Sequence, residues 1–312
     1  MNLSLFISTL FFFLAPELTE AKTHSDPTER ANQLNEVLGQ RKPPKLVSIK
    51  KRTNIGKTKI SRVKISSPSV LSAADEIEAS FTYYQTPGEN KEVVFLLSPI
   101  FGITPMDHWI AINLARFGVN TVISYYGQDT KSIDEIPAGI VKSMQAQMSI
   151  VDWVAQREEV DSSRFGMAGI SLGGIRTAFI MGADPRMKAA TIVVGGGNFA
   201  DILTDSGSYA VKLIRRQHMK AESISDKEEY RQRVNEVLNA RISDLLWDQD
   251  GSKFQLYLDR RDRFVPSSSQ EYLEAILPEA RVTWTNIGHI AAAGKFASSE
   301  VKVMLDFMRE HW

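Results

Sequence analysis

The five residues Gly169-Ile170-Ser171-Leu172-Gly173 decide the fold of this chain, because they join a strand-like run to a helix-like run. Residues 164–168 predict a short buried strand, and the apolar residues 175–181 predict a packed helix. A serine on so tight a strand-to-helix turn is held in a strained backbone conformation with its hydroxyl exposed. The glycines two residues to either side lack the Cβ atoms that would clash there. The stretch therefore marks Ser171 as a candidate nucleophile.

Strand-like and helix-like segments alternate on both sides of this turn. Helices are expected at 106–117 and 137–156, and a closing helix from about residue 299. Apolar strands alternating with helices imply a mostly parallel sheet with helices on both faces, so the fold class is α/β. The other strands are expected at 78–84, 92–97, 120–125, 188–194, 253–258 and 281–285.

Composition excludes several classes of protein. The chain has 312 residues, of which 43% are hydrophobic, so it can bury a large core. Its 37 basic and 37 acidic residues cancel, which argues against nucleic-acid binding. The absence of cysteine removes thiol nucleophiles, disulfides and cysteine-ligated zinc. None of the five histidines forms an H-E-x-x-H pair, so neither a metal nor a cofactor is expected.

The chain divides into an N-terminal leader, a linker and one large domain. The apolar run at residues 3–15 is too short to span a bilayer, and residues 1–21 are interpreted as a signal peptide for export, to the periplasm or outside the cell. An uncleaved anchor or a buried helix is the alternative. Polar residues 22–45 are expected to be a linker, and 46–312 the domain. Within it, residues 201–250 predict a helical, cap-like insertion or a plain connecting helix pair.

Residues 41–64 carry ten Lys or Arg and no acidic residue. Interleaved Val and Ile around Asn54-Ile55-Gly56 predict a β-hairpin with its turn at 54–57. Lysines on an edge strand protect a sheet from aggregation, and this is the simpler interpretation. The alternative is a weak contact with an anionic membrane surface through residues 41–64.

A serine hydroxyl becomes a good nucleophile only when a histidine takes its proton and an acid holds that histidine. Asp262 and His289 follow the last two expected strands, where a parallel sheet gathers functional residues. The order Ser171, Asp262, His289 fits this architecture. Asp259 is the alternative acid, and either aspartate could instead pair with nearby arginines at 260, 261 and 263.

From about Glu78 to its C-terminus the chain resembles the α/β-hydrolase superfamily. The resemblance implies that Ser171 is the nucleophile, His289 the general base and then acid, and Asp262 its orienting partner. It also implies the α/β-hydrolase fold, a central sheet with helices on both faces and a small helical insertion. Four segments carry the resemblance: Leu96-Leu97-Ser98-Pro99-Ile100-Phe101-Gly102, Gly169-Ile170-Ser171-Leu172-Gly173-Gly174, Asp262-Arg263-Phe264-Val265-Pro266 and Gly288-His289.

Two backbone N–H groups are candidates for an oxyanion hole. The turn points the N–H of Leu172, at the start of the helix, toward an oxyanion formed on a carbonyl that Ser171 attacks. Many α/β-hydrolases have His-Gly after the third strand, where this chain has Ser98-Pro99. The second donor is therefore expected to be the backbone N–H of Ile100, with Phe101 the alternative.

These residues predict a serine hydrolase that cleaves a carboxylic ester through an acyl-enzyme on Ser171, with a small-molecule or peptide acyl substrate. A serine peptidase of the same fold is the runner-up. An acyltransferase and a non-catalytic envelope-binding protein on a hydrolase scaffold are further alternatives. Of the other histidines, His108 is expected to cap a helix, and His218, among basic residues, to be solvated.

Overall fold

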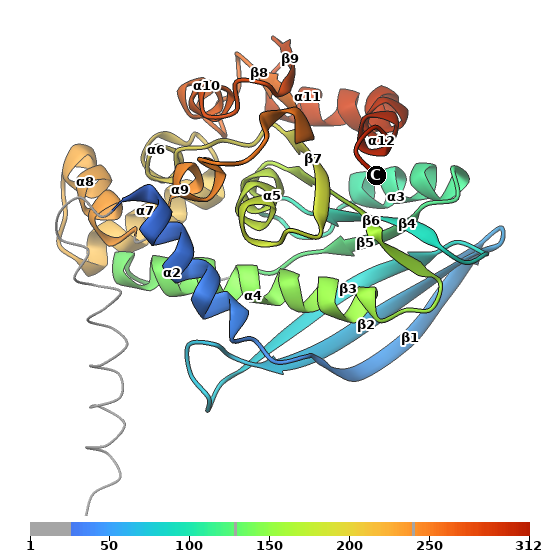
Figure 1. Ribbon diagram of the computed structural model, residues 1–312. Coiled ribbons are helices and arrows are strands. Elements are labelled where there is room, and N and C mark those ends of the chain that lie inside the picture. The colour runs from blue at the N-terminus through green and yellow to red at the C-terminus, as the bar shows by residue number, and fades with distance from the viewer. Residues whose placement is uncertain (1–25, 128–129, 239–240) are drawn as a thin grey trace, which may run out of the picture.

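The computed structural model describes residues 26–127, 130–238 and 241–312. Its strands form one nine-stranded sheet, in the order β1-β2-β3-β5-β4-β6-β7-β8-β9, within the part of the chain described (Figure 1). Pairs from β1 to β3, and β3 with β5, are antiparallel, and the remaining pairs are parallel. The strands are β1 Lys45–Ile55, β2 Thr58–Pro68, β3 Glu76–Gln85, β4 Lys91–Leu97, β5 Asn120–Ser124, β6 Val160–Ile170, β7 Met187–Val193, β8 Phe254–Asp259 and β9 Arg281–Thr285.

Helices cover both faces of this sheet, as the alternating pattern predicted. On one face α2, α4, α5, α9 and α10 enclose one hydrophobic core, and on the other α3, α11 and α12 enclose a second. The fold class is therefore confirmed. The helices are α2 Pro27–Gly39, α3 Pro105–Arg116, α4 Ile136–Ala155, α5 Leu172–Ala183, α6 Phe199–Asp205, α7 Tyr209–Ala221, α8 Lys227–Val237, α9 Ile242–Leu246, α10 Ser267–Ala275, α11 His289–Lys295 and α12 Val301–Arg309, with short helices at Ile133–Glu135 and Gly251–Lys253 and a π-helix at Phe296–Glu300.

The basic stretch folds as the expected hairpin. Strands β1 and β2 pair with a register that closes at Ile55 and Thr58. The turn glycine, Gly56, has a φ of +57°, a conformation that side chains with a Cβ rarely adopt. Strand β1 is the edge strand, and its residues are almost all exposed. A membrane contact through residues 41–64 stays a prediction.

The structure corrects the expected linker at 22–45, because residues 27–39 form helix α2. Ala31, Leu34 and Leu38 are buried at helical spacing and pack into the core with α4 and α9. The Arg30 guanidinium binds both carboxylate oxygens of Asp244 at 2.7 Å. The polar composition of this segment concealed a narrow apolar stripe, and that stripe joins α2 to the domain.

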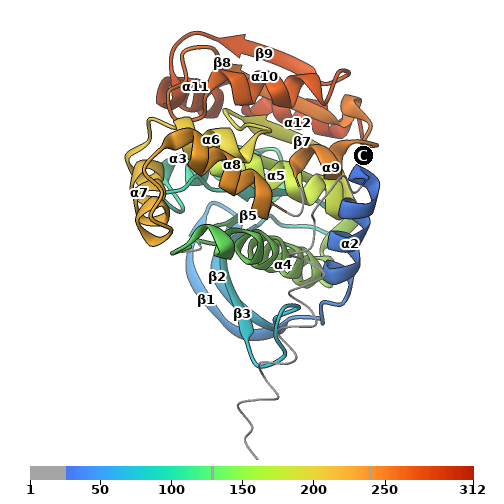
Figure 2. The same ribbon diagram turned by 90° about the vertical axis from the view of Figure 1, so that its left-hand side faces the viewer.

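The segment between β7 and β8 is helical, and it contains α6 to α9. Figures 1 and 2 show α6, α7 and α8 gathered at one flank of the sheet. Their buried side chains, including Leu203, Val211 and Tyr230, form a third cluster with Ile133 and Ile136. This cluster attaches the helical segment to the start of α4.

The expected signal peptide at residues 1–21 lies outside the described residues. Among the helices that are described, none has the length and apolar character needed to cross a membrane.

Candidate active site

Strand β6 delivers Ser171 to the start of α5 through a strained turn. Ser171 has φ +58° and ψ −120°, so it is one of the few non-glycine residues with positive φ in the described chain. Its own N–H donates to the Val193 carbonyl at 2.8 Å, which anchors the turn to β7. Such strain is maintained only where the surroundings enforce it, and it is typical of reactive positions.

The glycines on either side of Ser171 are required by close packing. A Cβ atom on Gly169 would collide with the carbonyl oxygen of Gly173 and lie 2.5 Å from the Thr177 hydroxyl. A Cβ atom on Gly173 would collide with the backbone carbonyl of Leu97 on β4. Gly169 therefore lets strand β6 approach α5, and Gly173 lets α5 approach β4, because both positions lack side chains.

The loops after β8 and β9 bring Asp262 and His289 together. The Nδ1 atom of His289 lies 2.6 Å from Oδ2 of Asp262, and both side chains are buried. Backbone N–H groups of Phe264 and Val265 donate to the other carboxylate oxygen at 2.7 and 2.9 Å. With Oδ2 accepting from Nδ1–H, the opposite nitrogen, Nε2, is left as the base of a neutral imidazole.

Gln270 is a site residue that sequence reasoning missed. Its Nε2 donates to Asp262 Oδ2 and to the Val265 carbonyl, both at 2.9 Å. Its Oε1 accepts from the backbone N–H of Asp259 at 2.9 Å. The buried Gln270 amide therefore fixes the end of β8 relative to the loop that carries Asp262. A glutamine early in a helix carries no signal of that role in the sequence.

Asp259 has a different role from Asp262. It accepts hydrogen bonds from the Thr285 hydroxyl and from the backbone N–H groups of Arg261, Ile287 and Gly288, at 2.7 to 3.0 Å. Burial alone would raise the pKa of Asp259, but these hydrogen bonds outweigh it and hold that pKa below its usual value. Asp259 thus fastens the loop that carries His289, without touching the imidazole. The guanidinium of Arg260 lies instead over the Trp284 ring, 4.4 Å from its centroid.

The two residues predicted to supply oxyanion-hole N–H groups, Leu172 and Ile100, both line the cavity beside Ser171. Leu172 is the first residue of α5, and Ile100 lies in the turn after β4. Neither N–H has an acceptor among the described residues. The turn is closed by the Gly102 N–H donating to the Pro99 carbonyl at 3.0 Å, and Tyr125 donates its hydroxyl to the Ile100 carbonyl at 2.9 Å. The neighbouring Phe101 side chain is exposed.

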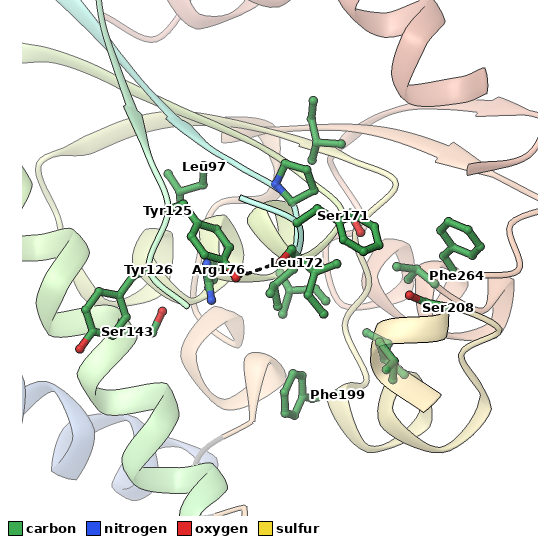
Figure 3. A pocket seen from close by; sticks show the side chains of 18 of the residues that line it. Leu97, Tyr125, Tyr126, Ser143, Ser171, Leu172, Arg176, Phe199, Ser208 and Phe264 are labelled. Carbon is green, nitrogen blue, oxygen red and sulfur yellow. Dashed lines mark hydrogen bonds between the residues drawn. The ribbon is translucent and has the colours of Figure 1, made fainter. Parts of the chain in front are cut away.

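Ser171, Leu172, Ile100 and His289 line one cavity of about 500 Å³ (Figure 3). Most of its lining is aliphatic or aromatic, and it is bounded by β-strand ends, α4, α5 and α7. Within the described chain, neither the Ser171 hydroxyl nor Nε2 of His289 has a hydrogen-bond partner, so both are available to a ligand. The ring of Phe264 packs on His289 with centroids 5.0 Å apart.

His218 and His108 are placed differently from expectation, and the cap of α3 is Thr104 instead of His108. His218 is fully buried, not solvated, and it lines the cavity wall. It lies within hydrogen-bonding distance of the Tyr230 hydroxyl, at 3.1 Å, and of the Thr130 carbonyl, at 2.9 Å. His108 contacts the Tyr84 hydroxyl at 2.7 Å. In the described chain, no three His, Asp or Glu side chains gather as metal ligands would.

The arrangement of sheet and helices is that of an α/β-hydrolase fold, and solved structures share it. An acetyl xylan esterase from Paenibacillus sp. R4 aligns with a TM-score of 0.66 and 16% identity over 100% of both chains. Acetyl xylan esterase 1 from Thermoanaerobacterium sp. aligns with a TM-score of 0.64 and 14% identity, covering 95% of this chain and 98% of that one. The resemblance to the α/β-hydrolase superfamily is thereby confirmed at the level of the fold.

Sequence comparison gives a narrower match. The model of the prolyl oligopeptidase family matches residues 141–248, which include the Ser171 turn. An acylaminoacyl peptidase from Pyrococcus horikoshii aligns in structure with a TM-score of 0.55 and 12% identity, over 86% of this chain and 50% of that one. No curated protein matches by sequence. Together the fold and the family match support a serine hydrolase.

Proposed function

We propose that this protein hydrolyses a carboxylic ester through an acyl-enzyme on Ser171. Nε2 of His289 takes the hydroxyl proton as Ser171 Oγ attacks the ester carbonyl. The backbone N–H groups of Leu172 and Ile100 hold the resulting oxyanion. As the tetrahedral intermediate collapses, the imidazolium returns the proton to the alcohol oxygen, and the alcohol leaves.

Water completes the cycle. His289 removes a proton from a water molecule, whose oxygen attacks the acyl carbonyl, and the second collapse releases the acid and restores the Ser171 hydroxyl. Asp262 stays ionised throughout and stabilises the imidazolium through Nδ1. The chain's own side chains and backbone supply every group in these steps.

The observation that carries this proposal is that three separate loops bring their candidate catalytic residues to one cavity. The strained Ser171 follows β6, Asp262 follows β8 and His289 follows β9, yet the imidazole is bound to the carboxylate at 2.6 Å and opens into the cavity that contains the serine. A scaffold that only binds a partner has no need of a positive φ at a serine beside a carboxylate-bound histidine.

The test is hydrolysis of p-nitrophenyl hexanoate by the purified protein. Changing Ser171→Ala should lower kcat by about 10⁴- to 10⁶-fold, since the nucleophile is gone. Ser208→Ala is a matched control, because Ser208 lines the same cavity and its hydroxyl does not cap α7. Equal loss in both variants, or full activity in folded Ser171→Ala protein, would contradict the proposal.

A peptidase activity is the second candidate, and the family match over residues 141–248 favours it. Amide cleavage by the same residues would follow the same steps with an amine as leaving group. The described residues lining the cavity include no Asp or Glu to hold a free amino terminus. Hexanoyl p-nitroanilide tests this candidate: anilide cleavage that is lost in Ser171→Ala would favour the peptidase, and ester cleavage without anilide cleavage would favour the esterase.

A further inference from the structure

One cation stands alone in the cavity. Among the described residues that line it, Arg176 is the only Lys or Arg, and there is no Asp or Glu. Arg176 lies on α5, little more than one helical turn after Ser171. Its guanidinium sits over the ring of Tyr125, with 5.4 Å between Cζ and the centroid. In the described chain the guanidinium has no hydrogen bond and no ion pair.

An arginine in this situation is costly unless something binds it. Burial lowers the pKa of Arg176 to about 10, which still leaves the side chain charged near neutral pH. Arg176 is half-buried, and a charge partly withdrawn from water without a partner destabilises a protein. The face of one aromatic ring compensates only part of that cost. Arg215, which is buried on α7, shows the contrast, because its guanidinium donates to the carbonyls of Leu203 and Thr204. Arg176 has five N–H donors, and none of them is engaged by a described residue.

Free hydroxyl groups share the Arg176 side of the cavity. Tyr126 and Ser143 both line the cavity, and neither hydroxyl has a partner among the described residues. In the view of Figure 3, Tyr126, Ser143 and Arg176 are drawn on one side of Ser171, and Phe264 and Ser208 on the other. In this view one end of the cavity holds Arg176 and two free hydroxyl groups, and the opposite end holds the ring of Phe264.

The position of His289 determines which half of a bound ester lies at each end of the cavity. His289 must protonate the departing alcohol, so the alcohol lies beside His289 and Phe264, whose rings are in contact. The acyl chain then extends away from His289, toward Arg176. One unpaired cation suits one carboxylate, which the planar guanidinium can bind through two parallel N–H donors.

We propose that the acyl group of the substrate carries a second, free carboxylate, which Arg176 binds. This inference rests on the proposed function and adds to it the substrate class, a monoester of a dicarboxylic acid. Ser171 Oγ forms a bond to the ester carbonyl carbon and the alcohol leaves with the proton from His289. Water then releases the dicarboxylate, so one ester and one water give one alcohol and one dicarboxylic acid.

The experiment compares mono-p-nitrophenyl adipate with p-nitrophenyl hexanoate. Both acyl chains have six carbons and the same leaving group, and only adipate ends in a carboxylate. Wild-type protein should prefer the adipate ester in kcat/KM. Arg176→Met keeps the apolar bulk of the side chain and should reduce that preference by about ten- to hundredfold, the usual effect of losing a hydrogen bond to a charged group.

Two control variants and one control substrate sharpen the result. Arg176→Lys keeps the charge and should retain part of the preference. Arg216→Met removes an exposed arginine from α7, outside the cavity lining, and should leave the preference unchanged. The hexanoate ester of hydroxynitrobenzoate carries its carboxylate in the alcohol half. Its kcat/KM relative to p-nitrophenyl hexanoate should not change in Arg176→Met.

Three results would overturn the inference while leaving the proposed function intact. These are hydrolysis of both esters without preference, a preference that survives in Arg176→Met, and an effect of Arg176→Met on the ester with the carboxylate in its alcohol half. If neither ester is cleaved, the proposed function fails, and calorimetry then tests only whether Arg176 binds a carboxylate. Adipate should then bind Ser171→Ala protein and not Ser171→Ala/Arg176→Met protein. Equal binding, or no binding to either, would contradict it.

Discussion

The parallel and antiparallel halves of the sheet use strands in different ways. Strand β8 in the parallel half has all six of its residues buried, whereas β1 in the antiparallel half is exposed along nearly its whole length. Every candidate catalytic residue follows a parallel strand, as Ser171 follows β6, Asp262 follows β8 and His289 follows β9. Parallel strands all end at one edge, so their loops converge, whereas a hairpin returns its chain to the opposite edge. The comparison predicts that chemistry resides in the parallel half.

After loss of the nucleophile itself, the largest effect on turnover is expected at the acid beside His289. Asp262→Asn should lower kcat by about 10⁴-fold, because an amide at this position favours the wrong imidazole tautomer. Steady-state hydrolysis of p-nitrophenyl hexanoate measures it. If Asp259→Asn costs more than Asp262→Asn, the roles of the two aspartates are reversed.

The strand-to-helix turn gives the next largest effect. Gly173→Ala places a methyl group against the Leu97 carbonyl, so the turn must shift away from β4 and the free energy of unfolding should fall by about 1–3 kcal/mol, with loss of activity. Urea titration measures the change. Gly294→Ala is the matched control, since nothing lies within 4 Å of its added Cβ. Equal stabilities of the two variants would show that the turn tolerates a side chain.

A smaller effect on turnover is expected at the end of β8. Asp259→Asn weakens the hydrogen bonds to the loop that carries His289, and should lower the free energy of unfolding by about 1–3 kcal/mol. Because Asp259 does not touch the imidazole, most of kcat should remain. Thermal unfolding and kcat, measured on the same preparation, separate a loss of stability from a loss of turnover. A stable variant with no activity would place Asp259 among the catalytic residues.

The smallest effect is expected in the antiparallel half. Lys50→Ser with Lys51→Ser removes two exposed charges from β1 and should change the free energy of unfolding by less than about 0.5 kcal/mol. The value of kcat/KM for p-nitrophenyl hexanoate should equal that of the wild type. A large loss of activity in this variant would mean that the hairpin takes part in the reaction, and the comparison of the two halves would fail.

Much of the fold could be predicted because its signals are local. Alternating apolar strands and helices predicted the parallel sheet, and Asn54-Ile55-Gly56 predicted the hairpin turn. Helix α2 was missed because its apolar stripe is narrow, with Ala31, Leu34 and Leu38 buried and Val37 partly buried, within a polar segment that contains Pro27. So narrow an apolar stripe is recognised only when the structure shows the core surface of α4 and α9 that it packs against.

Site residues that belong to no motif could not be predicted. Gln270 holds Asp262, eight residues earlier in the chain, but no spacing rule marks that contact. His218 reaches Tyr230 and also Thr130, which lies 88 residues away. His218 was expected to be solvated because its sequence neighbours are basic, but its side of α7 faces the core. Arg176 belongs to no motif. That it is the one Lys or Arg side chain among the described lining residues, without an acidic partner, follows only from the identity of all the others.

The central claim is that Ser171 is an activated nucleophile, and covalent labelling tests it most directly. The purified protein is treated with a fluorophosphonate, digested and analysed by mass spectrometry, beside Ser171→Ala and His289→Ala variants. The account predicts one phosphonyl adduct, on the peptide that contains Ser171, with no adduct in Ser171→Ala and very slow labelling of His289→Ala. An unlabelled, folded wild-type protein, or an adduct on another residue that persists in Ser171→Ala, would contradict it.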